Sequence, residues 1–194
     1  MPNWCYNTVQ IQHEDPAMIE RVRKGFDAGG LLMELIPTPK QLTETVSGHL
    51  GDDYADELNQ AKMRLNIKYF GHKDWYDWNV ANWGTKWDVG SDGQPALDLD
   101  VAVGKGLVLN FESAWSPPIG AYEKLMAMGF SIKAYYYEPG MCFAGIWMDG
   151  EDDYYEYSGM SSDEVQATIP DELDETFNIS EEIAQYEDEE NADE

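Results

Sequence analysis

Three histidines and two cysteines are the side chains best suited to binding a metal ion or acting as a nucleophile. His13, His49 and His72 lie far apart, and none has a histidine partner three or four residues away. Cys5 and Cys142 have no neighbouring cysteine, so the spacing of a zinc site is absent. No serine elbow or cysteine–histidine pair is suggested either. We therefore expect no metal site and no catalytic nucleophile.

Carboxylates are the most abundant side chains that could take part in acid–base chemistry. The chain of 194 residues has 38 Asp and Glu against 12 Lys and Arg, which gives a formal net charge of −26. Because carboxylates are so numerous, an acid–base pair could arise by chance, and their presence does not indicate catalysis. The segment "GKG" at residues 104–106 is too short for a phosphate-binding loop. The sequence therefore predicts no catalytic residues and no cofactor, and we expect that the protein is not an enzyme.

The acidic residues are unevenly distributed along the chain. Residues 149–194 hold 19 of them and no Lys or Arg, whereas residues 1–148 hold 19 acids and all 12 bases. Such a charge repels nucleic acid and the inner surface of a membrane. It favours basic partners, including proteins that themselves bind nucleic acid. We expect no direct nucleic-acid binding and no membrane binding.

Short stretches of the acidic segment have apolar residues at helical spacing. Val165 and Ile169 lie four residues apart, and so do Leu173 and Phe177. This spacing predicts helices that dock on the rest of the protein and present carboxylates outward. Carboxylates on such a helix lie about 5–6 Å apart, whereas duplex DNA carries one charge per about 1.7 Å of its axis. The residues expected to contact a partner are Glu151, Asp152, Asp153, Glu156, Asp171, Glu172, Asp174 and Glu175.

Hydrophobic periodicity indicates the elements that position these groups. Residues 7–12 alternate like a half-buried strand, and residues 15–29 form a helix that Asp15 can cap. The apolar residues 31–39 predict a short strand ended by prolines, and residues 52–71 predict a second helix. From residue 86 onward we expect three strands, a helix and three more strands. The first of these six strands is expected at residues 86–89.

Short hairpins separated by a single helix favour an α+β fold. We expect a mostly antiparallel sheet of ferredoxin-like character, with helices packed on one face, plus an acidic C-terminal helical segment. The predicted domains are a body over residues 1–148, whose ferredoxin-like part covers roughly 86–148, and an acidic extension over residues 149–194. The last dozen residues are expected to be disordered, because charge runs are usually solvated.

The stretch "DWYDWNVANWGTKWD", residues 74–88, contains four of the seven tryptophans. One interpretation is a helix that buries its tryptophans against the sheet, ends at Gly84 and is followed by a strand. The other is a platform on which the bases of single-stranded nucleic acid stack. Such a platform needs a basic groove, and here the flanking acids outnumber the bases. We therefore favour a buried helix-to-strand corner.

Four motifs together resemble a known family: "MPNWCYNTV", "WYDWNVANWGTKWDV", "LNFESAWSPP" and "YYYEPGMCFAG". In this order, over roughly residues 1–147, they look like the uncharacterised phage and plasmid family known as YubB-like or Api-like. The resemblance implies a mobile-element origin and a C-terminal ferredoxin-like domain. It implies no established enzymatic activity and provides no catalytic residues. The acidic segment after residue 149 is not part of the family pattern, so specialisation of this chain is expected there.

The leading hypothesis is a non-enzymatic phage or mobile-element protein that inhibits a basic, nucleic-acid-binding defence protein of the host. Its acidic surface would take the place of DNA or RNA, and binding would depend steeply on salt. The alternative is a structural or interaction module that acts through its aromatic surface or by self-association. A homo-oligomer stays open under both hypotheses.

The expected location is the host cytoplasm. The N-terminus lacks the basic and apolar stretches of a secretory signal, and no apolar run approaches the roughly 18 residues that a membrane span needs. The two cysteines are expected to be free thiols in a reducing compartment.

Overall fold

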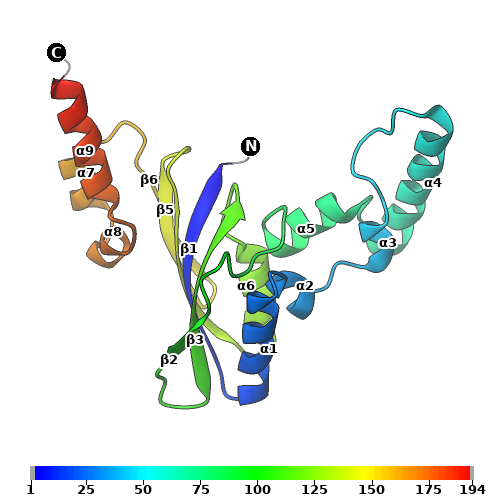
Figure 1. The fold of residues 1–194 in the computed structure, drawn as a ribbon, viewed down its shortest axis with the longest axis horizontal. Coiled ribbons are helices and arrows are strands. Elements are labelled where there is room, and N and C mark those ends of the chain that lie inside the picture. Colours follow the sequence, from blue (N-terminus) through cyan, green and yellow to red (C-terminus); the bar gives the residue numbers. More distant parts are fainter. Residues whose placement is uncertain (1–2, 193–194) are drawn as a thin grey trace.

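A six-stranded antiparallel sheet forms the centre of the computed structural model, which describes residues 3–192 (Figure 1). The spatial order of its strands is β2-β3-β1-β4-β5-β6. Their bounds are β1 Trp4–His13, β2 Leu97–Leu99, β3 Lys105–Ala114, β4 Ser131–Glu138, β5 Phe143–Met148 and β6 Glu151–Glu156. The α+β class and the antiparallel sheet predicted from the sequence are therefore confirmed.

The strand–helix–strand–strand–helix–strand order of a ferredoxin-like motif runs through β1, α1 (Pro16–Asp27), β2, β3, α6 (Ile119–Ala127) and β4. It takes in β1 and α1, which precede the range of roughly 86–148 expected from the sequence. Four helices are inserted between α1 and β2: α2 Leu31–Leu35, α3 Lys40–Thr43, α4 Asp53–Phe70 and α5 Trp75–Trp83. β5 and β6 extend the sheet beyond the motif.

The main hydrophobic core lies between the sheet and the helices α1, α2, α5 and α6, drawn to its right in Figure 1. Alternate residues of β1 and β3 point into it, among them Val9, Ile11, Leu107 and Leu109. α4 projects away from this core and buries only three of its residues, Asn59, Met63 and Asn66.

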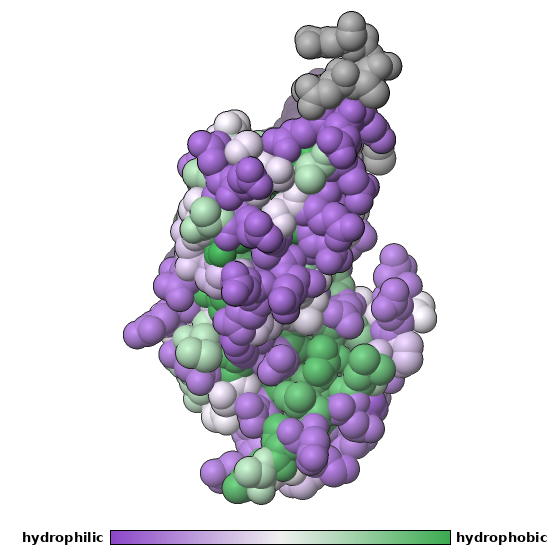
Figure 2. All heavy atoms as spheres, turned by 90° about the vertical axis from the view of Figure 1, so that its left-hand side faces the viewer, coloured by the Kyte–Doolittle hydropathy of each residue, from purple (hydrophilic) through white to green (hydrophobic). Residues whose placement is uncertain are grey.

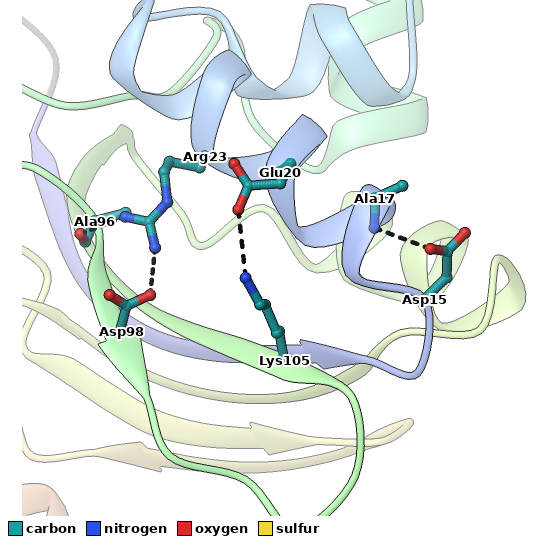
Figure 3. A network of polar contacts seen from close by, with 7 residues as sticks. All are labelled: Asp15, Ala17, Glu20, Arg23, Ala96, Asp98 and Lys105. Carbon is teal, nitrogen blue, oxygen red and sulfur yellow. Dashed lines mark hydrogen bonds and ion pairs between the residues drawn. The ribbon is translucent and has the colours of Figure 1, made fainter.

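Polar contacts fix α1 against the edge of the sheet (Figure 3). Asp15 accepts a hydrogen bond from the backbone N–H of Ala17 at 2.9 Å and so caps the helix, as its sequence predicts. Further along, Arg23 donates to the carbonyl oxygen of Ala96 at 3.0 Å and pairs with Asp98 on β2. These contacts join the first helix to the short edge strand that lies 75 residues further along the chain.

Two predicted strands are wrong, and one carboxylate explains both. Residues 31–35 form helix α2, and no strand is assigned to residues 86–89 within the described chain. Asp88 instead accepts hydrogen bonds from the backbone N–H groups of Leu32 at 2.7 Å and Met33 at 3.0 Å. It thus caps α2 from 56 residues away. Burial raises the pKa of Asp88, although these backbone N–H groups and that of Val89 oppose the effect.

The tryptophan-rich stretch forms the predicted helix, α5, which Asp74 caps and which ends at Gly84 with a positive φ. Trp83 is almost fully buried and donates its indole N–H to the carbonyl oxygen of Ile36 at 2.9 Å. Trp87 behaves differently, because it lies at the surface and is 38% exposed. Only part of the stretch is therefore core.

Helices of the acidic segment lie on the opposite face of the sheet, to the left in Figure 1. They are α7 Ser162–Thr168, α8 Asp171–Phe177 and α9 Ile179–Ala192. Val165, Ile169, Leu173 and Ile179 form a second hydrophobic core with residues of β4 and β5, including Tyr137. Helices therefore cover both faces of the sheet.

The sheet also crosses the domain boundary expected at residue 148, because β6 pairs with β5 along its whole length. The last dozen residues lie in α9 as far as Ala192, and residues 193 and 194 lie outside the described chain. Among the described helices, none combines the length and apolar character needed to cross a membrane.

Candidate acidic interface and adjoining groove

The four predicted contact residues of β6 are divided between the two faces of the sheet. Asp153 is paired with Ile146 of the second core, so Glu151 and Asp153 lie on the face that α7, α8 and α9 occupy. Asp152 and Glu156 lie on the other face, where Asp152 accepts a hydrogen bond from the Tyr136 hydroxyl at 2.7 Å. All four side chains are exposed at the edge of the sheet.

Two of the four predicted residues on α8 hold the structure together. Glu172 accepts hydrogen bonds from the Lys133 ammonium and the Tyr135 hydroxyl, both at 2.8 Å, and so fastens α8 to β4. These two donors lower the pKa of Glu172 below its ordinary value. Asp174 accepts from the backbone N–H of Ser180 at 2.8 Å and caps the start of α9.

The remaining predicted residues are available to a partner. They make no hydrogen bond or ion pair with another described residue, and they are Glu151, Asp153, Glu156, Asp171 and Glu175. Four of them, Glu151, Asp153, Asp171 and Glu175, lie on the side of the sheet that carries α8, and we call these four residues the acidic interface. Glu156 points from the other face of β6. α8 packs over β4 and β5, and β6 is the next strand of the same sheet. No Lys or Arg follows Lys133 in the sequence, so the negative charge of residues 134–194 is not offset by any basic residue of that segment.

Hydrophilic side chains dominate the upper part of the face that carries these helices (Figure 2). The helices α8 and α9 do not cover β1 and β3 on this face. A groove of about 820 Å³ lies between these two helices and the uncovered strands. Its walls come from the sheet, from α8 and α9, and from the loop before β2. This volume lies within the range of about 300–1,000 Å³ that is typical of ligand-binding pockets.

A cross-strand row of three side chains crosses the sheet wall of the groove. Tyr6 on β1 lies opposite Glu112 on β3 and opposite Tyr137 on β4. The rings of Tyr6 and Tyr137 stack with centroids 6.2 Å apart, and Tyr137 stacks on Phe177 of α8 at 5.6 Å. The groove therefore has an aromatic wall with a carboxylate beside it.

Among the described residues, the charged side chains that line the groove are all carboxylates: Asp92, Glu112 and Glu182. The hydroxyl of Tyr137 donates to Glu182 on α9 at 3.0 Å. Tyr157 also lines the groove, and its buried hydroxyl has no hydrogen-bond partner among the described residues. Burial, with the Tyr137 hydroxyl close by, raises the pKa of Tyr157 well above its ordinary value.

The sequence did not predict these groove residues. Alternation along "NWCYNT" places Tyr6 on the face opposite Cys5 and Asn7, but the periodicity does not indicate what covers that face. The pairing of Tyr6 with Glu112 and Tyr137 depends on contacts more than 100 residues apart. Only the strand order could have brought them together.

A second surface feature surrounds Lys86, whose ammonium lies 4.5 Å from the ring centroid of Trp87 and 5.2 Å from that of Trp115. Trp4 contacts Trp87 with ring centroids 5.8 Å apart. The three tryptophans are 38–43% exposed. We call them, with Lys86, the tryptophan cluster, and each tryptophan comes from a different one of the motifs that carry the family resemblance.

The residues considered for metal binding and nucleophilic chemistry lie apart. His49 pairs with Asp56 at 3.0 Å, and the His13 ring packs against Phe130. Within residues 3–192, no three His, Cys, Asp or Glu side chains gather closely enough to hold a metal ion. The expectation that the protein is not an enzyme stays a prediction.

Comparison with known proteins gives one structural likeness. The chain is similar to the crystal structure of protein api92 from Yersinia pseudotuberculosis, which is assigned to family DUF1281. The two share 12% sequence identity and a TM-score of 0.43, over 82% of this chain and 99% of that protein. No family model matches the sequence, and no curated protein matches it.

Proposed function

We propose that this chain is a non-enzymatic protein of a phage or plasmid that inhibits a basic, nucleic-acid-binding protein in the host cytoplasm. The acidic interface contacts the cationic site that this partner uses for nucleic acid. In this proposal the chain is a YubB-like or Api-like protein, for which the four sequence motifs are the support.

One observation carries the proposal: the four exposed carboxylates of the acidic interface, which have no internal partners, lie on a folded edge strand and a docked helix. Glu172 holds that helix in place, so the neighbouring Asp171 and Glu175 do not need ordering when the partner binds. A pre-ordered set of charges loses less conformational entropy on binding than a disordered acidic tail would.

Charge reversal at the exposed positions tests the proposal. The variant carries Glu151→Lys, Asp153→Lys, Asp171→Lys and Glu175→Lys, and it leaves the structural carboxylates Glu172 and Asp174 intact. Tagged wild-type and variant protein are used to capture basic proteins from host lysate at low salt, and each captured protein is then challenged with duplex DNA. We expect the variant to lose the capture, and DNA to displace the partner from the wild type, because both occupy one cationic site.

A control matched in the number of reversed charges carries Lys at four exposed carboxylates outside β6 and α8, namely Glu14, Asp53, Glu57 and Glu123. This control should capture the same proteins as the wild type. The proposal is wrong if the four-residue variant retains the same partner with an unchanged dependence on salt.

The alternative function, a module that acts through its aromatic surface or by self-association, is favoured by two observations. The tryptophan cluster is exposed, and the projecting helix α4 leaves Tyr54, Leu58, Leu65 and Tyr69 exposed at helical spacing. Under this alternative, binding survives high salt and charge reversal but is lost when Trp87 is replaced by Ala.

A further inference from the structure

We propose that the groove between the open half of the sheet and helices α8 and α9 binds an arginine side chain of a basic polypeptide. This inference rests on the proposed function, since it specifies how a basic partner is recognised beyond its overall charge. The groove adjoins the acidic interface because α8 contributes both Glu175 to that interface and Phe177 to the groove.

Charge complementarity selects a cation as the occupant. Asp92, Glu112 and Glu182 line the groove, and within residues 3–192 no Lys, Arg or His lines it. Glu112 and Asp92 make no hydrogen bond or ion pair with another described residue, whereas Glu182 accepts one hydrogen bond from Tyr137. An anionic ligand would meet repulsion from all three carboxylates.

The aromatic wall selects a guanidinium over an ammonium group. A guanidinium is planar and weakly hydrated, so it stacks on tyrosine faces and pairs with a carboxylate through two parallel hydrogen bonds. Here Tyr6, which is 41% exposed, lies beside Glu112 in the cross-strand row. A guanidinium stacked on the Tyr6 ring would therefore lie beside the Glu112 carboxylate, with which it can pair.

The hydroxyl of Tyr157 adds a second indication of a ligand. Tyr157 is 5% exposed and lines the groove, and its hydroxyl makes no hydrogen bond of good geometry with a described residue, although the Tyr137 hydroxyl lies close to it. A buried polar atom without a hydrogen bond is costly, and native proteins contain few of them. Its oxygen can accept an N–H of the guanidinium or of a water molecule that the ligand holds in place.

Two short peptides of equal charge test the inference, one of three arginines and one of three lysines, both with blocked ends. Their binding is measured by calorimetry at one fixed low salt concentration. We expect the arginine peptide to bind several-fold more tightly, because cation–π stacking and bidentate pairing favour the guanidinium. Bound arginine peptide should also slow alkylation of Cys142, whose side chain lines the groove.

Three single variants locate the binding. Glu112→Gln and Tyr157→Phe should each weaken the arginine peptide about tenfold, the loss expected when a hydrogen bond to a charged group is removed. Glu123→Gln, which changes another exposed carboxylate, on α6, should have no effect. Tyr157→Phe removes a hydroxyl that makes no hydrogen bond of good geometry, so it should change the thermal stability of the free protein little. The thermal midpoint of each variant is measured beside its binding, so that weaker binding is not ascribed to misfolding.

The outcomes separate this inference from the proposed function. If the two peptides bind equally and the groove variants bind like the wild type, while charge reversal abolishes binding, the groove inference is wrong and the proposed function stands. If the groove variants lose the arginine peptide but charge reversal leaves capture of basic proteins unchanged, the groove does bind arginine and the proposed function is wrong.

Discussion

At the level of single residues, the two cysteines have very different environments. Cys5 is fully buried in the main core, and burial raises the pKa of its thiol to about 12. Cys142 is half-buried, has a φ of 55° and lines the groove. Because the thiolate is the reactive form, burial and a raised pKa both disfavour reaction at Cys5, whereas the Cys142 side chain is accessible from the groove.

We therefore predict that a thiol reagent modifies one cysteine in the native protein, Cys142, and two in denaturant. Mass spectrometry of the labelled protein, with peptide mapping, measures this directly. The Cys142→Ser variant is the control and should remain unlabelled until it unfolds. Labelling of Cys5 in the native protein at the same rate as Cys142 would contradict the buried position of β1.

Individual residues also show where sequence reasoning is sufficient. Asp15 and Gly84 mark helix ends, as predicted from the sequence, because capping depends on neighbours within a few residues. Asp88 could not be interpreted in this way, since its partners are the backbone N–H groups of a helix 56 residues earlier. The surface position of Trp87 could not be predicted either, because Trp87 contacts Trp4 and shares the Lys86 side chain with Trp115, and both residues are distant in the sequence.

At the level of elements, α8 depends on Glu172, and this dependence should appear as a function of pH. The folded-state pKa of Glu172 is lowered, so its stabilising contribution is fully present above the pKa of an unfolded glutamate, about 4.3. This contribution is lost as the pH falls through the lowered folded-state value.

Glu172→Gln should therefore reduce the free energy of unfolding by about 1 kcal/mol at neutral pH, a low value because the side chain is half exposed to solvent. The difference from the wild type should shrink below about pH 4.3. Urea unfolding at several pH values measures both effects. Glu175→Gln, on the same helix but without a partner, should change stability by less than about 0.5 kcal/mol; equal losses in the two variants would contradict the role of Glu172.

Element types along the acidic segment were predictable, because Val165, Ile169, Leu173 and Phe177 repeat at helical spacing. Their docking site was not, because it is formed by Tyr135, Tyr137 and Ile146 on alternate positions of two other strands. Residues 31–39 show the reverse case: Leu31, Leu32 and Leu35 suit either a short strand or a helical turn, and their periodicity could not decide. The contact with Asp88 decided in favour of the helix.

At the level of the whole molecule, a net charge of −26 on 194 residues implies repulsion throughout the folded state. Repulsion among exposed carboxylates destabilises a compact chain, and salt screens it over about 10 Å at 0.1 M. The ion pairs that salt would weaken are largely exposed and contribute little.

The thermal midpoint of unfolding should therefore rise as sodium chloride is added from low to moderate concentration. Differential scanning calorimetry measures this shift, and the four-residue charge-reversal variant is the control, since its smaller net charge should reduce the rise. A midpoint that falls with added salt would mean that attractive pairs outweigh the repulsion.

The two outer strands of the sheet have a consequence for self-association. An edge strand offers unpaired backbone N–H and C=O groups to which another chain can add as a further strand. Here β2 is only three residues long, while β6 carries acidic side chains on both faces. Repulsion between the charges on β6 therefore disfavours the addition of a second β6 strand and so opposes fibre-like aggregation. A basic partner that neutralises these charges removes this repulsion, so the partner must itself cover the free edge of β6.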